Sequence, residues 1–346
     1  MTEQMQAAVL YGKEDVKVES VAIPKVGPND VLVRVKAALT CGTDVKVFRR
    51  GYHARMIVPP AVFGHELAGD IVAVGERVTR FKKGDRVVAG NSAPCGDCYY
   101  CMRDLENLCE DLLFNNGAYA EFILIPGRIV QKNLYKIPVH IDYQDAALAE
   151  PLACVLRGLE ESNVRAGDTV VVIGLGPIGL MFVRMAKVIG ARVIAMARRE
   201  AQLEVAKRMG ASHLVCLPET EDPIGVVRGL TDGRGADVVI EAVGKPEVWN
   251  LSVQLLRKGG TVNFFGGCPN ETHVDLDTNL LHYSELTCKA SFHHTPRLVK
   301  QALDAVAQGQ ICARDFVTGQ APLSSLKDVL RLLMNSSGRL KTAIIP

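Results

Sequence analysis

The sequence predicts an α/β protein of two domains, one built around a doubly wound parallel sheet and one mostly β. Three observations support this prediction. The chain has 346 residues, enough for two domains of ordinary size. Short β-branched runs separated by turn residues dominate residues 1–150. From about residue 152, apolar strands alternate with helical patterns, which is typical of parallel strands joined by crossover helices.

The elements of this pattern can be placed in order along the chain. The runs DVLVRVKAAL, AGDIVAVG and DRVVAG predict strands in the first domain. TVVVIG predicts a buried strand, and PIGLMFVRMAKVIGA predicts the helix after it. RVIAMAR, SHLVCL, ADVVIEAVG and GTVNFFGG continue the strands, with helical segments such as REAQLEVAKRMGA between them. Near the end, RLVKQALDAVAQGQI and LSSLKDVLRLLMNS predict amphipathic helices, and GRLKTAIIP predicts a strand.

Composition argues against two classes of function. The net charge is only +2, with no basic block, so a nucleic-acid-binding surface is not supported. The longest apolar runs contain Gly and Pro and are followed by charges, so no membrane span is predicted. The first twenty residues have no signal-peptide pattern, and we therefore expect a cytoplasmic protein.

Four of the ten cysteines lie in one loop, as Cys95, Cys98, Cys101 and Cys109. In a chain without a signal pattern, such a cluster indicates metal binding rather than disulfides. Four thiolates close a tetrahedral zinc site with no open position, so this zinc is predicted to be structural. An iron–sulfur cluster is less favoured, because the last gap is seven residues and Glu110, not Pro, follows the fourth cysteine.

The segment TVVVIGLGPIG places Gly174, Gly176 and Gly179 at G-x-G-x-x-G spacing between a predicted strand and helix. The first glycine would allow the tight turn, the second the approach of a pyrophosphate, and the third close packing of the helix on the strand. The surrounding strand–helix–strand unit favours dinucleotide binding at the helix N-terminus over a purely structural turn. The predicted cofactor contacts also include Pro177, Ile178, Val243 and Gly266.

The end of the second strand indicates which dinucleotide is bound, because an acidic side chain there binds the ribose hydroxyl of NAD. Here the strand VIAM is followed by Ala197, Arg198 and Arg199. A small residue and two guanidinium groups leave room and donors for a 2′-phosphate. We predict a preference for NADP through Arg198 and Arg199, with ribose binding by Glu200 as the alternative.

Candidate ligands for a second metal ion are dispersed along the chain. Cys41 lies in CGTD, His65 and Glu66 lie in GHE, and Glu150 lies in EP, just before the dinucleotide segment. Cysteine and histidine are good zinc ligands. Each of these residues alone, however, could equally be an ordinary buried side chain.

CGTD, GHE, the four-cysteine loop, EP and GLGPIG occur here in one chain and in this order. In this combination the sequence resembles the zinc-containing medium-chain dehydrogenase/reductase (alcohol dehydrogenase) family over essentially its whole length. It is most similar to the sorbitol and threonine dehydrogenase branch. The resemblance implies a GroES-like catalytic domain at residues 1–152, completed by 291–346, and a Rossmann dinucleotide-binding domain at 153–290. It also implies a homodimer or homotetramer.

The resemblance further implies the chemistry. Cys41, His65 and Glu66 would hold a catalytic zinc, and Glu150 would bind this zinc or exchange with its water. Each subunit would then contain one structural and one catalytic zinc. The catalytic zinc would lower the pKa of an alcohol, and hydride would pass to NADP or NAD. The hydroxyl of Thr43 would pass on the proton of the alcohol.

The sequence leaves the substrate open. We predict a secondary alcohol or polyol, with a threonine-like hydroxy amino acid or a non-catalytic dinucleotide-binding role as alternatives. The chain departs from its relatives at Lys46, where many carry a histidine on the proton exit route. It departs again at His293 and His294, where polyol dehydrogenases often carry an Arg-Tyr pair. The predicted substrate pocket includes Tyr52, Phe114 and His293.

Overall fold

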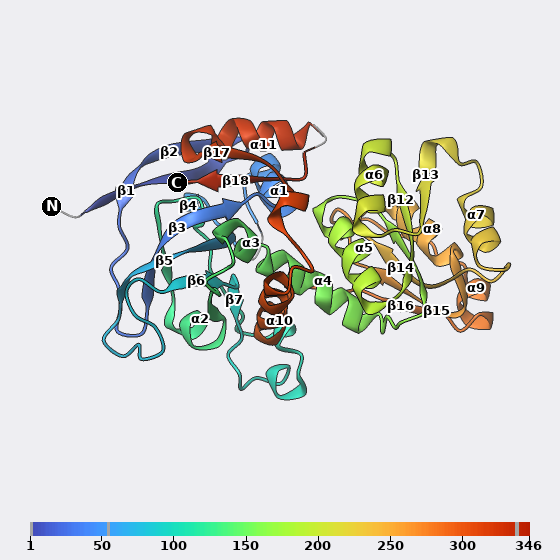
Figure 1. Cartoon of the computed structure of the whole chain (residues 1–346), viewed down its shortest axis with the longest axis horizontal. Helices are drawn as coiled ribbons and strands as arrows, with labels where there is room; N and C mark the ends of the chain where they lie inside the picture. The colour runs from blue at the N-terminus through green and yellow to red at the C-terminus, as the bar shows by residue number, and fades with distance from the viewer. Residues whose placement is uncertain (1–2, 54–55, 336–338) are drawn as a thin grey trace. The chain divides into compact units, whose positions relative to one another are not determined.

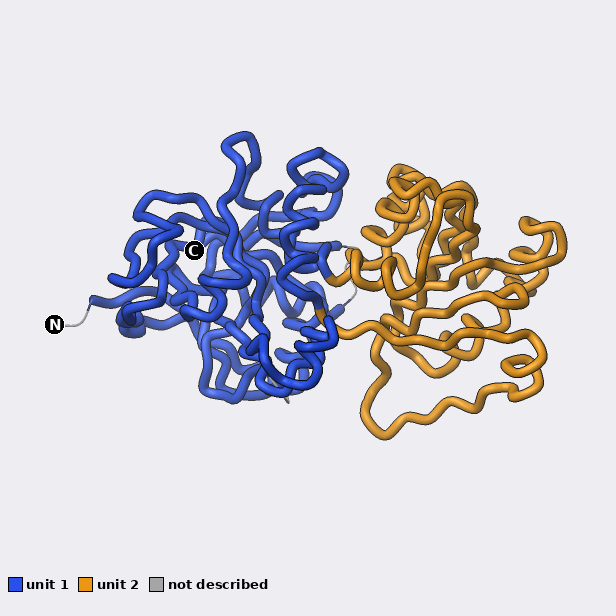
Figure 2. The backbone as a smooth tube through the Cα atoms, turned by 90° about the horizontal axis from the view of Figure 1, so that it is seen from below, with its two compact units in different colours: residues 1–153, 294–346 blue, residues 154–293 orange. Residues whose placement is uncertain are grey.

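The computed structural model describes residues 3–53, 56–335 and 339–346. The chain divides into two compact units, which Figure 2 shows in different colours. Residues 1–153 and 294–346 form the first unit, and residues 154–293 form the second. Among the described residues, no helix is long and apolar enough to cross a membrane.

The second unit contains a parallel sheet with the strand order β13-β12-β11-β14-β15-β16. The order reverses at β11, so the carboxyl ends of β11 and β14 form the switch point at which such sheets bind ligands. This sheet confirms the predicted doubly wound fold. Its strands are β11 (Thr169–Ile173), β12 (Arg192–Ala197), β13 (His213–Cys216), β14 (Ala236–Glu241), β15 (Leu256–Phe264) and β16 (Thr287–Lys289).

Crossover helices join these strands and cover the sheet, which explains why the strands consist largely of apolar residues. All five side chains of β11 are buried, as expected for a strand that is covered on both faces. Helices α5, α6 and α8 contact the sheet (Figure 1). Helix α5 starts at Pro177, where the missing N–H of proline costs no hydrogen bond. The helices are α5 (Pro177–Ile189), α6 (Glu200–Met209), α7 (Pro223–Leu230), α8 (Pro246–Gln254) and α9 (Thr278–Tyr283).

The first unit is built on a mostly antiparallel sheet with the order β10-β6-β5-β3-β18-β17, in which β9 also pairs with β3. The C-terminal strand β18 pairs antiparallel with β3 and brings Ala343 opposite Leu39. Two smaller sheets have the orders β2-β1-β4 and β7-β8. The strands are β1 (Gln4–Gly12), β2 (Asp15–Ala22), β3 (Val31–Leu39), β4 (Ala61–Val62), β5 (Glu66–Val74), β6 (Arg86–Ala89), β7 (Ser92–Ala93), β8 (Leu113–Phe114), β9 (Phe122–Ile125), β10 (Leu134–Lys136), β17 (Val317–Pro322) and β18 (Lys341–Ile345).

Residues 1–150 contain more helix than the sequence predicts, since only strands separated by turns are expected there. Helix α1 is short and carries the β-branched Val45 and Val47, so its sequence lacks a clear helical pattern. It forms because Cys41 and Asp44 cap its N-terminus reciprocally. The amphipathic helix α11 lies within the segment predicted for it, and α10 begins one residue before its predicted segment, at Pro296. The helices of this unit are α1 (Gly42–Arg50), α2 (Gly127–Lys132), α3 (Tyr143–Ala147), α4 (Ala149–Glu161, which runs on into the second unit), α10 (Pro296–Ala307) and α11 (Leu326–Met334).

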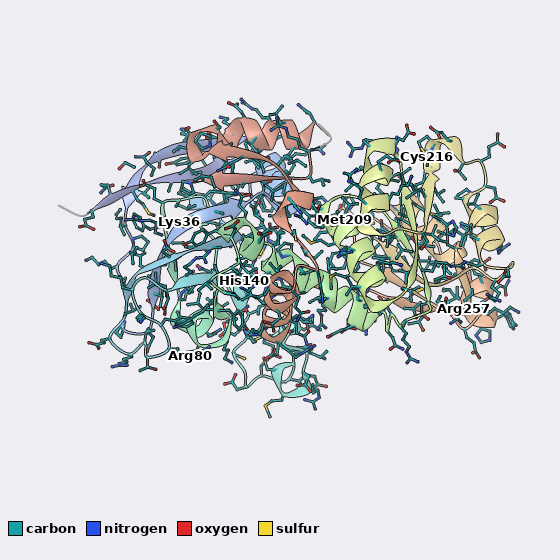
Figure 3. All side chains as sticks on the ribbon, viewed as in Figure 1. Lys36, Arg80, His140, Met209, Cys216 and Arg257 are labelled. Carbon is teal, nitrogen blue, oxygen red and sulfur yellow. The ribbon has the colours of Figure 1, made fainter. Side chains whose placement is uncertain are left out.

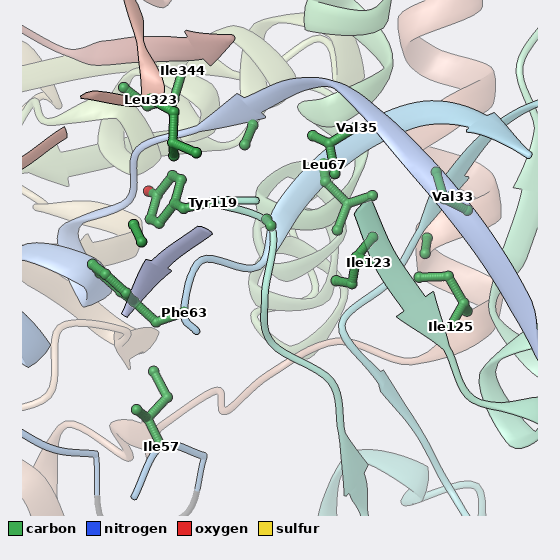
Figure 4. Packing of buried hydrophobic residues seen from close by; sticks show 14 of the residues in the cluster. Val33, Val35, Ile57, Phe63, Leu67, Tyr119, Ile123, Ile125, Leu323 and Ile344 are labelled. Carbon is green, nitrogen blue, oxygen red and sulfur yellow. The ribbon is translucent and has the colours of Figure 1, made fainter. Parts of the chain in front are cut away.

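A hydrophobic cluster fills the first unit and includes residues that flank the candidate functional side chains. Val33 and Val35 of β3, with Leu67 of β5, contribute to it (Figure 4). Tyr119 and Phe63 belong to the same cluster and are fully buried. Many charged side chains are exposed, as Arg80 illustrates (Figure 3), whereas a few, such as Lys341 and Glu66, are buried.

Candidate active site and metal centres

The four cysteines of the loop meet at one point. Short 3-10 turns at Cys101–Arg103 and Glu106–Leu108 fold the loop back on itself. The Sγ atom of Cys95 lies 3.4 Å from that of Cys109 and 3.9 Å from that of Cys101, and Cys98 lies 3.9 Å from Cys109. Tetrahedral coordination with Zn–S bonds of about 2.3 Å requires sulfurs roughly 3.8 Å apart. The cluster therefore fits a zinc ion without rearrangement.

The electrostatics of this cluster also point to a cation. Backbone N–H groups of Cys101 and Glu110 lower the pKa of Cys98 to about 6. Burial, together with the neighbouring thiols, raises the pKa of Cys101 to about 12. Four crowded sulfurs cannot all ionise by themselves, because each thiolate disfavours the next. A divalent cation removes that conflict, which is why such clusters release protons when they bind zinc.

A second group of metal-binding side chains gathers where α1 and β5 begin. Cys41 caps the N-terminus of α1, and His65 and Glu66 enter β5. One ligand atom from each of these three residues lies within 4.8 Å of the other two. A thiolate, an imidazole and a carboxylate at this spacing leave a fourth position open, which is the donor set of a catalytic zinc site.

Asp44 orients the imidazole of His65. Its Oδ1 atom lies 3.2 Å from His65 Nδ1, and both side chains are buried. Burial lowers the pKa of His65, but the charges of Asp44 and Cys41 outweigh this effect and raise it well above its usual value. With Nδ1 turned to the carboxylate, Nε2 is the nitrogen available to a metal. A carboxylate behind a ligating histidine commonly fixes the ring and its tautomer in this way.

Glu66 is held by a buried lysine. Both carboxylate oxygens of Glu66 accept hydrogen bonds of 2.6 Å from Lys341 Nζ, and this ammonium also donates to the Thr40 carbonyl at 3.1 Å. Glu66 is completely buried and Lys341 is 2% exposed. Burial raises the pKa of Glu66 to about 7, an effect that Lys341 opposes and the charge of Glu150 reinforces. Strand β18 thus supplies the counter-charge of the site.

In the second unit, the glycine-rich turn joins β11 to α5. Gly174 has a φ of +94°, and a Cβ there would lie 2.6 Å from Val243. A Cβ on Gly179 would overlap the carbonyl oxygen of Gly174, so the first turn of α5 can approach the end of β11 only with glycine. A Cβ on Gly176 would meet no atom within 4 Å, so its backbone faces open space. This is the geometry of a pyrophosphate-binding turn at a helix N-terminus.

Comparison with known proteins identifies the chain. Residues 27–138 match the family described as the alcohol dehydrogenase GroES-like domain, and residues 177–308 match the zinc-binding dehydrogenase family. The chain is 31% identical to a sorbitol dehydrogenase of Bacillus subtilis over 352 residues, which cover 99% of this chain and 98% of that protein. The chain belongs to the zinc-binding dehydrogenase family.

Other relatives agree with this assignment. The dehydrogenase is 34% identical to an L-threonine 3-dehydrogenase of Bacillus licheniformis, with 93% of each chain covered. Its fold matches a crystal structure from Sinorhizobium meliloti, described as a zinc-binding dehydrogenase bound to NADP, with a TM-score of 0.90. That match has 32% identity and covers 100% of both chains.

The dehydrogenase therefore has a GroES-like unit and a Rossmann unit, as predicted, and it uses zinc and NAD(P). The four-cysteine cluster is the structural zinc site, and Cys41, His65 and Glu66 form the catalytic one. Glu150 is 5% exposed but does not lie within 4.8 Å of all three of these ligands in the described structure. It lies beside His294, whose Nε2 is 3.5 Å from Glu150 Oε1.

The other predicted site residues have varied surroundings within their own units. Thr43 is half-buried in the first turn of α1, and Lys46, farther along that helix, is exposed. Tyr52 is 56% exposed. Phe114 is half-buried in β8, and His293 has a left-handed φ of 64°. In the Rossmann unit, Arg198 and Arg199 are exposed after β12, as is Val243 after β14, whereas Pro177, Ile178 and Gly266 are half-buried.

Sequence reasoning missed the residues that support the ligands. Lys341, Asp44 and Tyr119 were not singled out, although Asp44 lies within the quoted CGTD motif. A lysine between apolar residues in a predicted strand is a signal that a buried partner is needed. His294, which stands where polyol dehydrogenases often carry an Arg-Tyr pair, is buried, and its Nε2 lies 2.9 Å from Asn91 Oδ1.

Proposed function

We propose that this zinc-dependent dehydrogenase transfers hydride between a secondary alcohol or polyol and NADP. The observation that carries the proposal is the set formed by the half-buried Cys41 and the buried His65 and Glu66, three donors that leave one position of a tetrahedral zinc site open to a substrate oxygen. Similarity to a sorbitol dehydrogenase supports a polyol. We propose that the GroES-like unit holds the alcohol and that the Rossmann unit holds the dinucleotide.

Zinc held by Cys41, His65 and Glu66 supplies a Lewis acid that makes a substrate hydroxyl more acidic. Around it, the chain fixes the ligands through buried partners, Asp44 behind His65 and Lys341 behind Glu66. We propose that Thr43 Oγ1 accepts a hydrogen bond from the substrate hydroxyl and relays its proton by giving up its own toward solvent, because Thr43 lies two residues after a ligand in the first turn of α1. A bound nicotinamide would supply the acceptor for the hydride of the substrate carbon.

We propose that Glu150 acts as a second carboxylate near the zinc ligands. Its charge raises the pKa of Glu66, which means that the two carboxylates are close enough to repel one another. A carboxylate in this position would bind zinc in place of a water molecule or hydrogen-bond that water. His294 limits the movement of Glu150 from one side.

The preference for NADP is proposed from the end of β12. Ala197 is buried at the end of the strand, and the exposed Arg198 and Arg199 follow it with no acidic residue before Glu200. Guanidinium groups bind a phosphate in a bidentate manner, whereas NAD offers only a hydroxyl at this position. The crystal structure from Sinorhizobium meliloti contains NADP, which is consistent with this proposal.

This preference can be tested by measuring kcat/KM for NADP and NAD with Arg198→Asp. We expect the ratio to fall by about a hundredfold, since about 3 kcal/mol is a reasonable value for a lost charge-assisted pair that is replaced by a repulsive one. If the native enzyme uses NAD more efficiently and Arg198→Asp leaves the ratio unchanged, the proposal is wrong.

A hydroxy amino acid such as threonine is the second candidate substrate, because relatives at 34% identity are threonine dehydrogenases. Tyr52, Phe114 and His293 remain the proposed contacts of the substrate. A screen of polyols, secondary alcohols, sugar phosphates and amino alcohols, with both cofactors, distinguishes the candidates. Highest kcat/KM for threonine would overturn the polyol proposal without affecting the assignment to the family.

We also propose that the enzyme is a homodimer or homotetramer in a reducing compartment such as the cytoplasm. Strand β16 lies at the edge of the Rossmann sheet, and all three of its side chains are exposed. An exposed edge strand offers unpaired backbone groups to a second copy. Five of the ten cysteines lie in the two zinc sites, and this use of cysteine is typical of a reducing compartment. Light scattering after size-exclusion chromatography would measure the oligomeric state.

A further inference from the structure

Tyr119 lies deep in the GroES-like unit, outside the motifs that identify the family site. Its side chain is completely buried in the segment that connects β8 to β9. The ring packs edge-on against Phe63 with a centroid distance of 5.1 Å, and Figure 4 shows both rings among aliphatic side chains. A phenylalanine would fill such a place equally well, so the hydroxyl requires an explanation of its own.

The hydroxyl of Tyr119 hydrogen-bonds to the carboxylate of Asp44. Tyr119 Oη donates to Asp44 Oδ2 over 2.6 Å, and the Leu39 carbonyl at 3.3 Å is a more distant neighbour. Burial raises the pKa of Tyr119 well above its usual value, and the charge of Asp44 raises it further. The hydroxyl therefore keeps its proton and remains a donor at every pH at which the enzyme would work.

Because of this bond, the two carboxylate oxygens of Asp44 have different partners. Oδ2 accepts the hydroxyl of Tyr119 and, over 2.9 Å, the backbone N–H of Cys41. Oδ1 is left facing His65 Nδ1 at 3.2 Å. Rotation of the carboxylate plane about its terminal bond would break both contacts of Oδ2. Tyr119 thus contributes to the direction in which Asp44 meets His65.

The backbone of Tyr119 and of its neighbours also hydrogen-bonds to the two residues that precede the ligand His65. The N–H of Tyr119 donates to the Phe63 carbonyl, and those of Gly117 and Ala118 donate to the carbonyl of Gly64, the residue before His65. Gly64 has a φ of +93°, and a Cβ there would lie 2.7 Å from the Tyr119 ring. The ring is therefore packed directly against the backbone that delivers His65 to the site.

We propose that Tyr119 is a positioning residue of the catalytic zinc site, whose hydroxyl holds Asp44 so that His65 presents Nε2 to zinc. The inference concerns metal binding and does not depend on the alcohol or on the choice between NADP and NAD. A core tyrosine with a merely structural role would affect the stability of the unit but not the affinity of this one site.

The test is the variant Tyr119→Phe, which removes the hydroxyl and keeps the ring. Zinc affinity of the two sites is measured by competition with a chromophoric chelator, and the ligand geometry by the visible spectrum of Co²⁺ placed in the catalytic site. We expect zinc to bind the catalytic site on the order of tenfold more weakly, the lower end of the effect of outer hydrogen-bonding partners. Affinity of the four-cysteine site should not change.

Tyr135→Phe is the matched control. The hydroxyl of Tyr135 donates to the Pro296 carbonyl at 2.7 Å in the same unit, away from the ligands. Both variants should lose thermal stability, but only Tyr119→Phe should weaken zinc binding at the catalytic site. If Tyr119→Phe binds zinc within about twofold of the native enzyme, or if the control weakens it equally, the proposal is wrong.

A double-mutant cycle asks whether Tyr119 acts through Asp44. In an Asp44→Ala background, which removes the acceptor of the Tyr119 hydroxyl, Tyr119→Phe should change zinc affinity by less than about twofold. If the two substitutions lower the zinc affinity independently, so that their fold-changes multiply, the hydroxyl acts by another route and the proposed mechanism is wrong. These measurements use no substrate, so their failure is separate from a failure of the proposed reaction.

Discussion

Replacing Lys341 by methionine should reveal how strongly the buried ion pair with Glu66 stabilises the GroES-like unit. Methionine has a similar length but no charge. The two groups lie 2.6 Å apart, and unit charges at that distance attract by about 6 kcal/mol at an effective dielectric constant of about 20. Part of this attraction only offsets the cost of burying both charges, so we expect the free energy of unfolding to fall by about 3–5 kcal/mol.

The assay is denaturation by urea, followed by two signals. Far-UV circular dichroism reports on both units, whereas the fluorescence of Trp249, the single tryptophan, reports on the Rossmann unit alone. We expect Lys341→Met to move the first signal to lower urea concentration and to leave the fluorescence transition in place. Zinc content is measured in parallel, so that loss of metal is recognised separately.

Two controls make the prediction specific. Lys36 forms a 3.6 Å pair with Asp70 that is partly exposed to solvent, so Lys36→Met should cost less than about 1 kcal/mol. In the Lys341→Met background, Glu66→Gln should restore much of the stability, because it removes the buried charge that was left without a partner. A loss no larger than that of Lys36→Met, or no recovery on adding Glu66→Gln, would refute the reasoning.

Two further predictions concern other parts of the same unit. Burial raises the pKa of Asp85, but hydrogen bonds from Lys136 and the backbone outweigh this and hold it below its usual value. The stability it contributes is therefore present above about pH 4 and is lost as the pH falls through the lowered pKa. Asp85→Asn should cost about 1 kcal/mol at pH 7 and progressively less as the pH falls below about 4 in urea denaturation, and a pH-independent difference would contradict this. Cys109→Ser should remove the structural zinc and lower the melting temperature, while metal analysis still finds the catalytic zinc; retention of both ions would contradict the assignment.

Features that are encoded within a short stretch of chain could be predicted from the sequence. The four cysteines lie between residues 95 and 109, so their spacing alone specifies a closed metal site. The glycine-rich turn is equally local, since its three glycines act within one strand–turn–helix unit. The parallel sheet could be predicted because its strands are buried on both faces and read as continuous apolar runs.

Contacts made across the fold could not be predicted in this way. Lys341 and Glu66 are 275 positions apart, and Tyr119 and Asp44 are 75 apart. Their proximity depends on which strands become neighbours, and the spacing of apolar residues does not encode this. Helix α1 was missed for a different reason, because its reciprocal cap uses a cysteine in place of the usual serine or threonine.

The placement of β18 beside β3 has a consequence for how the enzyme is made. Thr342 exchanges hydrogen bonds with Thr40, next to the ligand Cys41, and Lys341 neutralises Glu66. During translation, Cys41, His65 and Glu66 leave the ribosome long before this strand exists. The nascent protein must therefore carry an unfinished catalytic centre through most of its synthesis, and a product that stops short of residue 341 would leave the buried glutamate without its cation.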